Sequence, residues 1–286
     1  MNKTTITVTP SPARTGDFLA VCLLLSHYPK ITQVIRGLGP SGSISVGFTG
    51  PGDISDTDKG MRFTAVKAEG SHMPGSSLGL VLQHMALYKL ASVVWPWLHP
   101  LEIKETYGVF SMAEHLGCGA DAINRSILPL DQLLLDEFSK HKVLDESCAM
   151  FQQMILFGDA LIRQLQDAAT VDRWVIVNHQ ILTVDGQKVL WIPVDPPWPI
   201  EQAINRFVMQ NKKDVVASVI PDTKGPGWTF FRFRYHRNAL DFRNVQEPQV
   251  SFVDYDGSLL KTKERFNDES LIRKIIYLAK CSKQNK

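Results

Sequence analysis

The stretch from Thr5 to Tyr28, TITVTPSPARTGDFLAVCLLLSHY, is the sequence feature that most constrains the fold of this chain. It opens with the β-branched run Thr5 to Val8, which favours a buried strand. The chain breakers Thr9 to Pro12 then predict a loop, and the apolar run Phe18 to Leu25 predicts a helix that Asp17 can cap. In open α/β sheets, ligands bind outside the carboxyl end of a strand, so we expect a site at this loop.

The same loop offers little chemistry of its own. Asp17 is its one acidic residue, and it contains neither His nor Cys. No GxGxxG or GxxxxGK[ST] pattern follows the strand, so neither glycine-rich nucleotide fingerprint applies. The sequence therefore predicts a loop in a catalytic position without catalytic residues.

Composition limits the classes of protein that the chain can belong to. Apolar residues make up 44% and charged residues 21% of the 286 residues, which is typical of a globular protein with room for two cores. The formal net charge is +2, from 31 basic and 29 acidic residues. A charge this small gives no bulk attraction to nucleic acid or to a membrane surface.

Cysteine usage and hydropathy indicate the compartment. The four cysteines are scattered without a CxxC pair, which argues against a zinc knuckle and against a disulfide framework. No apolar run of about 18 residues occurs, and none precedes the first strand. We expect a cytoplasmic protein that is neither secreted nor inserted in a membrane.

The N-terminal part alternates strand and helix patterns. Lys30–Gly37, Ile44–Phe48 and Met61–Val66 are predicted strands that form a parallel sheet with the first strand. Asp53, Asp56 and Asp58, in the loop between the last two, are interpreted as solvated turn residues. Four helices are predicted by apolar spacing of three and four residues: Ser76–Trp95, Ala113–Asn124, Leu130–His141 and Asp145–Ala169.

The pattern returns to strands at Trp174, so we expect a boundary near it. The chain is predicted to be an α/β protein with a larger domain over residues 1–170 and a smaller α/β domain over residues 171–286. Asp185-Gly186 indicates a hairpin. The other predicted elements are a helix over Pro199–Met209, strands over Asp214–Ile220, Trp228–His236 and Val250–Asp256, and a last helix over Asp268–Ala279.

A set of short motifs occurs in a recognisable order. The C-terminal ones are Pro197-Trp198, Val219-Ile220-Pro221-Asp222, Gly227-Trp228, and Phe252-Val253-Asp254 followed by Lys261-Thr262. The N-terminal ones are Leu19-Ala20, Ser76 to Val81 with His84, and Gly108-Val109. In this order the chain resembles the melanocyte-proliferating-gene exonuclease family, relatives of the DHH phosphoesterases. The resemblance covers most of the chain and implies a DHH-phosphoesterase-like N-terminal domain.

That family binds metal ions, usually manganese, through His and Asp residues, and the ions activate water against a phosphodiester. In the alignment that the resemblance implies, only His84 matches one of the family's metal and phosphate groups. Asp17 replaces a Glu and Asp254 a His, and residues that are poor ligands replace nearly all of the others. The resemblance therefore implies that the family's fold is retained and its active site is lost. We expect no metal, no cofactor and no catalytic residue. The remaining positions of the lost site fall on Thr9, Arg14, Gly16, Gly47, Thr64, Ala65, Val66, Ile103, Thr106 and Asp254.

Two further features are candidate binding surfaces. Trp95 and Trp97 flank a proline and would make a protein-binding anchor if exposed, although core packing is the simpler interpretation. Arg232, Arg234 and Arg237 alternate with aromatic residues in FRFRYHR, which is typical of a face that stacks nucleic acid bases. A strand with one solvated face explains the same alternation.

From these patterns we expect a protein that is not an enzyme and acts as a protein-binding adaptor. One alternative is a residual metal-dependent phosphoesterase that uses Asp17, His72 and His84, although His84 lies on an apolar helix and fits a core position. The other is a nucleic-acid-binding module on the arginine-rich strand. The divergence of the motifs from the family's pattern suggests a fast-evolving genome, such as that of a large bacteriophage. An adaptor encoded by such a genome would act in protein targeting or host takeover.

Overall fold

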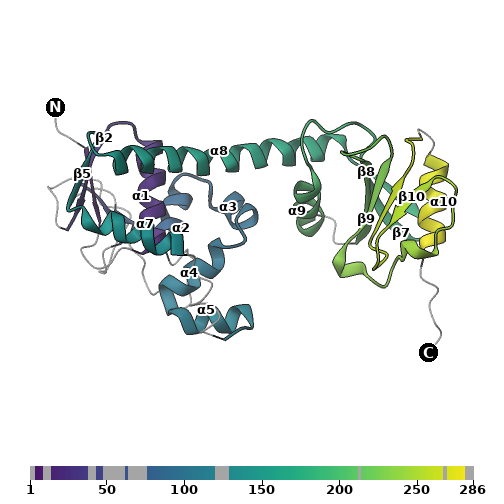
Figure 1. Cartoon of the computed structure of the whole chain (residues 1–286), viewed down its shortest axis with the longest axis horizontal. Helices are drawn as coiled ribbons and strands as arrows, with labels where there is room; N and C mark the ends of the chain where they lie inside the picture. Colours follow the sequence, from purple (N-terminus) through teal and green to yellow (C-terminus); the bar gives the residue numbers. More distant parts are fainter. Residues whose placement is uncertain are drawn as a thin grey trace. The chain divides into compact units, whose positions relative to one another are not determined.

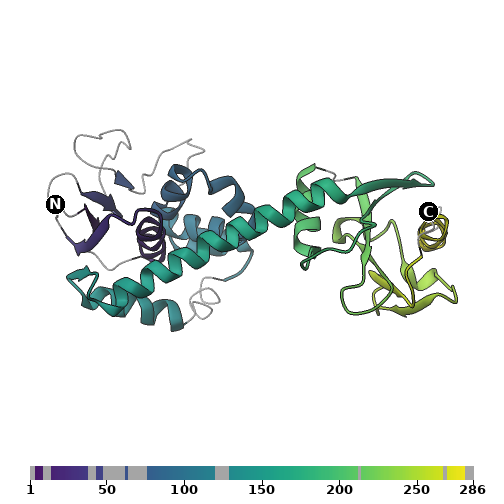
Figure 2. The same cartoon turned by 90° about the horizontal axis from the view of Figure 1, so that it is seen from above.

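The computed structural model describes residues 4–8, 14–37, 43–47, 62–63, 76–119, 129–211, 214–266 and 269–280 (Figures 1 and 2). By its contacts the chain divides into two compact units, residues 1–166 and residues 167–286. Each unit has its own β-sheet with helices packed on it, so the predicted mixed α/β class is confirmed. No helix of the described ranges is both long enough and apolar enough to cross a membrane.

The sheet of the first unit has the order β4-β3-β1-β2-β5. Its first four strands are parallel, as predicted, and the fifth runs antiparallel beside β2 at the edge. The antiparallel edge strand was not predicted from the sequence, because it is only three residues long. The strands are β1 (Thr4–Val8), β2 (Ile31–Arg36), β3 (Ile44–Val46), β4 (Arg62–Phe63) and β5 (Val143–Asp145).

Helix α1 (Thr15–His27) forms the centre of the first core. It is buried continuously from Gly16 to Leu25, which explains why this helix is apolar on all sides. The strand register places Val8 beside Val46 and Val46 beside Phe63, and all three side chains are fully buried. The strand, loop and helix order predicted for the first stretch of the chain is therefore confirmed where the structure describes it.

The predicted helix Ser76–Trp95 is two helices, α2 (Ser77–His84) and α3 (Tyr88–Val94). Ala86 lies between them in the left-handed region, with φ +57°. The Leu87 N–H donates to the Leu82 carbonyl and the Ala86 N–H to the Gln83 carbonyl, which is a Schellman ending. The apolar spacing continues through the break because α2 and α3 both contribute to the same core.

The helices that follow also differ from the prediction. α4 (Leu98–Tyr107) was not predicted from residue spacing, and α5 (Val109–Leu116) replaces Ala113–Asn124. α5 ends early because Gly117 takes a left-handed conformation with φ +65°. α7 (Pro129–Lys140) agrees with the predicted Leu130–His141 to one residue at each end.

Helix α8 (Ala149–Asn178) is longer than the predicted Asp145–Ala169, and the interpretation of Trp174 as the start of a strand region is wrong. Met150 and Met154, near its start, pack in the core of the first unit. Val175 packs in a core of the second unit, together with residues of β7, β8 and α9. The sequence VIVN is rich in β-branched residues but ends a helix, in which Val175 packs in that second core while Ile176 and Val177 are exposed.

The sheet of the second unit has the order β10-β11-β9-β8-β7-β6. The Asp185-Gly186 hairpin is confirmed, with φ values of +46° and +78° at the two turn residues, and β11 was not predicted. Helices α9 (Glu201–Asn211) and α10 (Glu269–Ala279) cover the two faces of the sheet (Figure 1). The strands are β6 (Gln180–Val184), β7 (Gln187–Trp191), β8 (Val215–Pro221), β9 (Trp228–Arg232), β10 (Val250–Val253) and β11 (Leu259–Thr262).

The predicted strand Trp228–His236 ends at Arg232, and a 3₁₀ helix, η1 (Arg234–His236), follows it. The chain leaves the sheet at Phe233, whose N–H donates to the Val216 carbonyl at 2.9 Å. Arg234 and Arg237 therefore do not lie on an alternating strand face, and the prediction of one continuous arginine-rich strand is wrong.

Candidate functional site

The candidate site lies where β1 and β3 end at the same edge of the first sheet. The two strands are parallel neighbours, so the segments that follow them begin at one place. Asp17 lies in the first turn of α1, the helix after β1, and Gly47 directly follows β3. Glu105 reaches this place from α4, where it contacts the backbone of Gly16.

Two glycines make room for the two carboxylates. A Cβ atom added at Gly47 would lie 2.6 Å from Cγ of Asp17, and Gly47 has a φ of +77°. A Cβ atom added at Gly16 would collide with the Glu105 carboxylate. The backbone of Gly47 and that of Gly16 therefore approach the carboxylates more closely than any other residue type permits.

Asp17 is a buried carboxylate with one unsatisfied oxygen. Only 1% of the residue is exposed. Burial raises the pKa of its carboxyl, while the neighbouring Ser77 hydroxyl and the Arg14 guanidinium act in the opposite direction. Neither Oδ2 of Asp17 nor Oγ of Ser77 has a hydrogen-bond partner of good geometry among the described residues. An unpaired buried carboxylate oxygen is costly, and carboxyls whose pKa is perturbed by burial cluster at functional sites.

Glu105 is poised to exchange a proton near neutral pH. Its Oε1 accepts a hydrogen bond from the Gly16 N–H at 2.6 Å. Burial, together with the charge of Asp17, raises the pKa of its carboxyl to about 7, against the opposing effects of the Gly16 N–H, Arg14 and Lys104. A carboxyl with a pKa near 7 is suited to general acid and base catalysis.

Arg14 is the cation beside the pair. It immediately precedes α1, is exposed, and its guanidinium donates to the backbone carbonyl of Glu105 at 3.4 Å. A guanidinium in this position can bind an anionic oxygen of a ligand while the two carboxylates handle a proton.

The described residues do not make the manganese site of the resembled family. No group of three or more His, Cys, Asp or Glu side chains converges at one point within the described ranges. Asp17 and Glu105 supply two carboxylates, whereas a hard divalent ion takes about six oxygen ligands. We therefore derive no chemical step through a metal ion.

Four positions that the resemblance assigned to the site meet at this edge. They are Arg14, Gly16, Asp17 and Gly47. Four others lie outside the described residues, namely Thr9, Thr64, Ala65 and Val66, as does His72 of the residual-phosphoesterase alternative.

Glu105 is the site residue that the sequence analysis missed. The resemblance assigned the family's two Asp positions to Ile103 and Thr106, which are half-buried on α4 on either side of it. The available signal was the pair of acids one helical turn apart, Glu102 and Glu105. Glu102 is also buried, and it accepts a hydrogen bond from the Tyr88 hydroxyl at 2.8 Å.

The structure does not bring His84 to Asp17. Ser77, beside Asp17, is the first residue of α2, and His84 is the last. Eight helical residues span about 12 Å at 1.5 Å each, so the two side chains lie at opposite ends of the helix. His84 instead contacts Tyr28, with Nε2 at 2.6 Å from the hydroxyl.

The remaining predicted residues have structural contacts. Asp254 caps the turn after β10, where it accepts from the Leu259 N–H at 2.8 Å. Trp95 is 1% exposed, and its Nε1 donates a hydrogen bond to Gln164. Trp97 is 40% exposed and stacks on Trp95, with 5.1 Å between the ring centroids.

Of the three arginines, Arg232 has a structural role. Its guanidinium donates to the backbone carbonyls of Arg237, Leu240 and Asp256, so it holds the turn after β9 together. The side chains of Arg234 and Arg237 are exposed. Arg234 lines a pocket described below.

Comparison with known proteins gives similarity in structure alone. No protein-family model matches the chain, and no curated protein matches it in sequence. Among solved structures, it is similar to the pGpG-specific phosphodiesterase PggH from Vibrio cholerae, with 13% identity over 97% of this chain and 99% of that one and a TM-score of 0.30. It is also similar to RecJ from Thermus thermophilus, solved in complex with Mn²⁺, with 12% identity, a TM-score of 0.27 and 97% of this chain covered. The match spans 52% of the RecJ chain.

These findings correct the prediction that the chain is not an enzyme. The similar structure that is covered over almost its full length is, by its name, a phosphodiesterase. The buried Asp17 carboxylate and the half-buried Glu105 carboxylate stand at the edge where the sequence predicted a loop without catalytic residues. Membership of the melanocyte-proliferating-gene family stays a prediction.

Proposed function

We propose that this protein is a phosphoesterase that hydrolyses a phosphodiester at the Asp17 and Glu105 carboxylate pair. The observation that carries the proposal is the Glu105 carboxyl, whose pKa is about 7, held beside the buried Asp17 at the carboxyl edge of a parallel sheet. The ordered motifs of the chain supply the reaction class, because they resemble those of phosphoesterases. The geometry supplies the acid and base that the motif alignment lacked.

In the proposed reaction, ionised Glu105 is the general base. It takes a proton from a water molecule whose oxygen forms a bond to phosphorus, and the bond from phosphorus to the leaving oxygen breaks. The leaving oxygen then receives this proton from Glu105, so the base is regenerated. Arg14 contacts the non-bridging phosphoryl oxygens, where negative charge is held. Asp17 is a positioning residue, because its charge helps to raise the pKa of Glu105.

The test is a hydrolysis assay with the full chain. Bis(4-nitrophenyl) phosphate and a short 5′-phosphorylated oligonucleotide serve as substrates, with a panel of divalent cations and with a chelator. Glu105→Gln keeps the size of the side chain and its hydrogen bond to Gly16 but removes the titrating group. We expect a loss of activity of about 100-fold or more, as is typical for a general base. Glu114→Gln, on the exposed surface of α5, is the matched control and should keep full activity.

Two results would overturn the proposal. One is a folded wild-type protein that hydrolyses no phosphodiester in any of these conditions. The other is a Glu105→Gln variant as active as wild type. A bell-shaped or sigmoidal rate profile with a midpoint near pH 7, lost in Glu105→Gln, would support the assignment of the base.

A further inference from the structure

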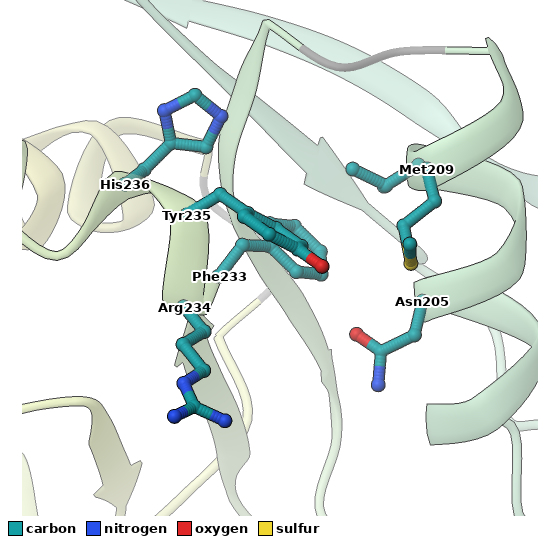
Figure 3. A pocket seen from close by; sticks show the side chains of 7 residues that line it. Asn205, Met209, Phe233, Arg234, Tyr235 and His236 are labelled. Atoms are coloured by element: carbon teal, nitrogen blue, oxygen red, sulfur yellow. The ribbon is translucent and has the colours of Figure 1, made fainter. Parts of the chain in front are cut away.

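A pocket of about 640 Å³ opens in the second unit between α9 and the segment that follows β9 (Figure 3). Its volume is within the range of about 300–1,000 Å³ that is usual for small-molecule sites. The lining residues are Asn205, Val208 and Met209 on one side and Phe233, Arg234, Tyr235 and His236 on the other.

The backbone of the second wall is fixed by hydrogen bonds. The Phe233 N–H donates to the Val216 carbonyl and the His236 N–H donates to the Phe233 carbonyl, both at 2.9 Å. Arg232, the residue before this wall, ties three backbone carbonyls of the surrounding loops together. The side chains on η1 are therefore presented from a rigid turn, as a binding site requires.

The aromatic rings of this wall favour a planar ligand. Figure 3 shows the rings of Phe233, directly before η1, and of Tyr235, on η1, directed toward the α9 wall, where Met209 lies. Phe233 is buried, whereas the Tyr235 residue is 78% exposed. Exposed aromatic rings opposite apolar side chains are typical of sites that stack heterocycles.

The polar groups of the pocket favour a negatively charged ligand that has hydrogen-bond donors and acceptors along one edge of a planar ring. No carboxylate lines the pocket, and none within the described ranges pairs with the exposed guanidinium of Arg234. Asn205 projects an amide from α9 toward the pocket (Figure 3). An amide can donate to and accept from the edge of a base in one plane, and a guanidinium can bind a phosphate.

We propose that this pocket binds a single purine nucleotide. The base stacks on Tyr235 against Met209, the Asn205 amide bonds the edge of the base, and Arg234 binds the phosphate. The site is assigned from the geometry of the second unit alone, so it does not depend on the phosphoesterase proposed for the first.

The test is a calorimetric titration of the full chain with AMP and with GMP, alongside adenosine and ribose 5-phosphate as partial ligands. At least one nucleotide should bind, and each partial ligand should bind at least about tenfold more weakly, because it lacks the phosphate or the base. Arg234→Ala should weaken nucleotide binding about tenfold or more and leave adenosine binding unchanged. Tyr235→Ala should weaken both.

Matched controls separate these effects from general damage. Arg173→Ala removes the same charge from an exposed position on α8, and Tyr255→Ala removes a ring that is 97% exposed outside the pocket. Both should leave affinity unchanged. Glu105→Gln should also leave it unchanged, so failure of the proposed hydrolysis and failure of this site are distinguishable.

Three results would overturn the proposal. The first is the absence of AMP and GMP binding by protein that melts cooperatively. The second is unchanged affinity in both Arg234→Ala and Tyr235→Ala. The third is binding of oligonucleotides alone, with a salt dependence that reports several phosphate contacts, which would replace the mononucleotide pocket with a nucleic-acid surface.

Discussion

Glu105 accepts a hydrogen bond from the backbone N–H of Gly16 at 2.6 Å, and this contact ties α4 to the first turn of α1. The start of a helix favours a negative charge, so the contact stabilises the ionised form of Glu105. Burial and the neighbouring Asp17 favour the protonated form more strongly, so the pKa of the Glu105 carboxyl is about 7. The site thus holds a carboxyl in two protonation states at neutral pH.

The raised pKa of Glu105 makes stability depend on pH. The ordinary pKa of a Glu in the unfolded chain is about 4.5, so the folded state binds the proton more tightly. The stabilising effect is complete below pH 4.5 and is lost as the pH rises to about 7. Glu105→Gln does not titrate, so its stability relative to wild type should increase across this window by about 1–3 kcal/mol and stay constant above it.

Chemical denaturation of both proteins from pH 4.5 to pH 8 measures this difference. Glu114→Gln, at an exposed position, should follow wild type across the whole range. A constant difference between wild type and Glu105→Gln would mean that Glu105 titrates normally.

Gly47 is predicted to be required for the carboxylate pair. In Gly47→Ala the new methyl group would lie 2.6 Å from Cγ of Asp17, and the backbone would keep a φ of +77° that alanine disfavours. Gly117→Ala has a similar φ of +65° but no atom within 4 Å, so it reports the backbone strain alone. We expect Gly117→Ala to cost about 1 kcal/mol and Gly47→Ala about 2–4 kcal/mol, measured by urea unfolding. Equal costs would show that Asp17 moves aside freely.

Local patterns predicted those elements whose burial is uniform. α1 is buried on all sides and β8 is buried at every residue, so their apolar runs gave the right element type. The Asp185-Gly186 hairpin was predictable because its turn residues have their own conformational preference. The sequence could not show that VIVN ends α8, because that outcome depends on a core formed with α9.

The position of the candidate site was predicted from the sequence, but one of its two carboxylates, Glu105, was not. The carboxyl edge of β1 follows from the strand and helix order alone, and Asp17 was identified there. Glu105 lies far along the chain on a helix that residue spacing did not predict, and only the folded packing of α4 against Gly16 brings it to that edge. Its raised pKa is likewise a property of burial, which no sequence pattern reports.

Substitutions at Trp95 and Trp97 are predicted to differ in their cost to stability, although the two rings stack on each other. Trp95 is fully buried and its Nε1 donates to Gln164 at 2.8 Å, whereas Trp97 is 40% exposed. Trp95→Phe should lose about 1–3 kcal/mol, because it leaves a cavity and removes the hydrogen bond to Gln164. Trp97→Phe should cost less than about 1 kcal/mol. Urea unfolding followed by circular dichroism measures both, and equal costs would contradict the burial of Trp95.

Ala86 is predicted to be a site where glycine stabilises the protein. It ends α2 with a φ of +57°, a conformation that costs alanine about 1–2 kcal/mol and glycine almost nothing. Ala86→Gly should therefore raise the free energy of unfolding by about 0.5–1 kcal/mol, after the greater chain entropy of unfolded glycine is subtracted. Ala160→Gly, at an exposed position inside α8, is the matched control and should lower it by about 1 kcal/mol. Opposite signs in thermal and urea unfolding would establish the left-handed ending of α2, and a loss of stability in Ala86→Gly would show that α2 and α3 are one continuous helix.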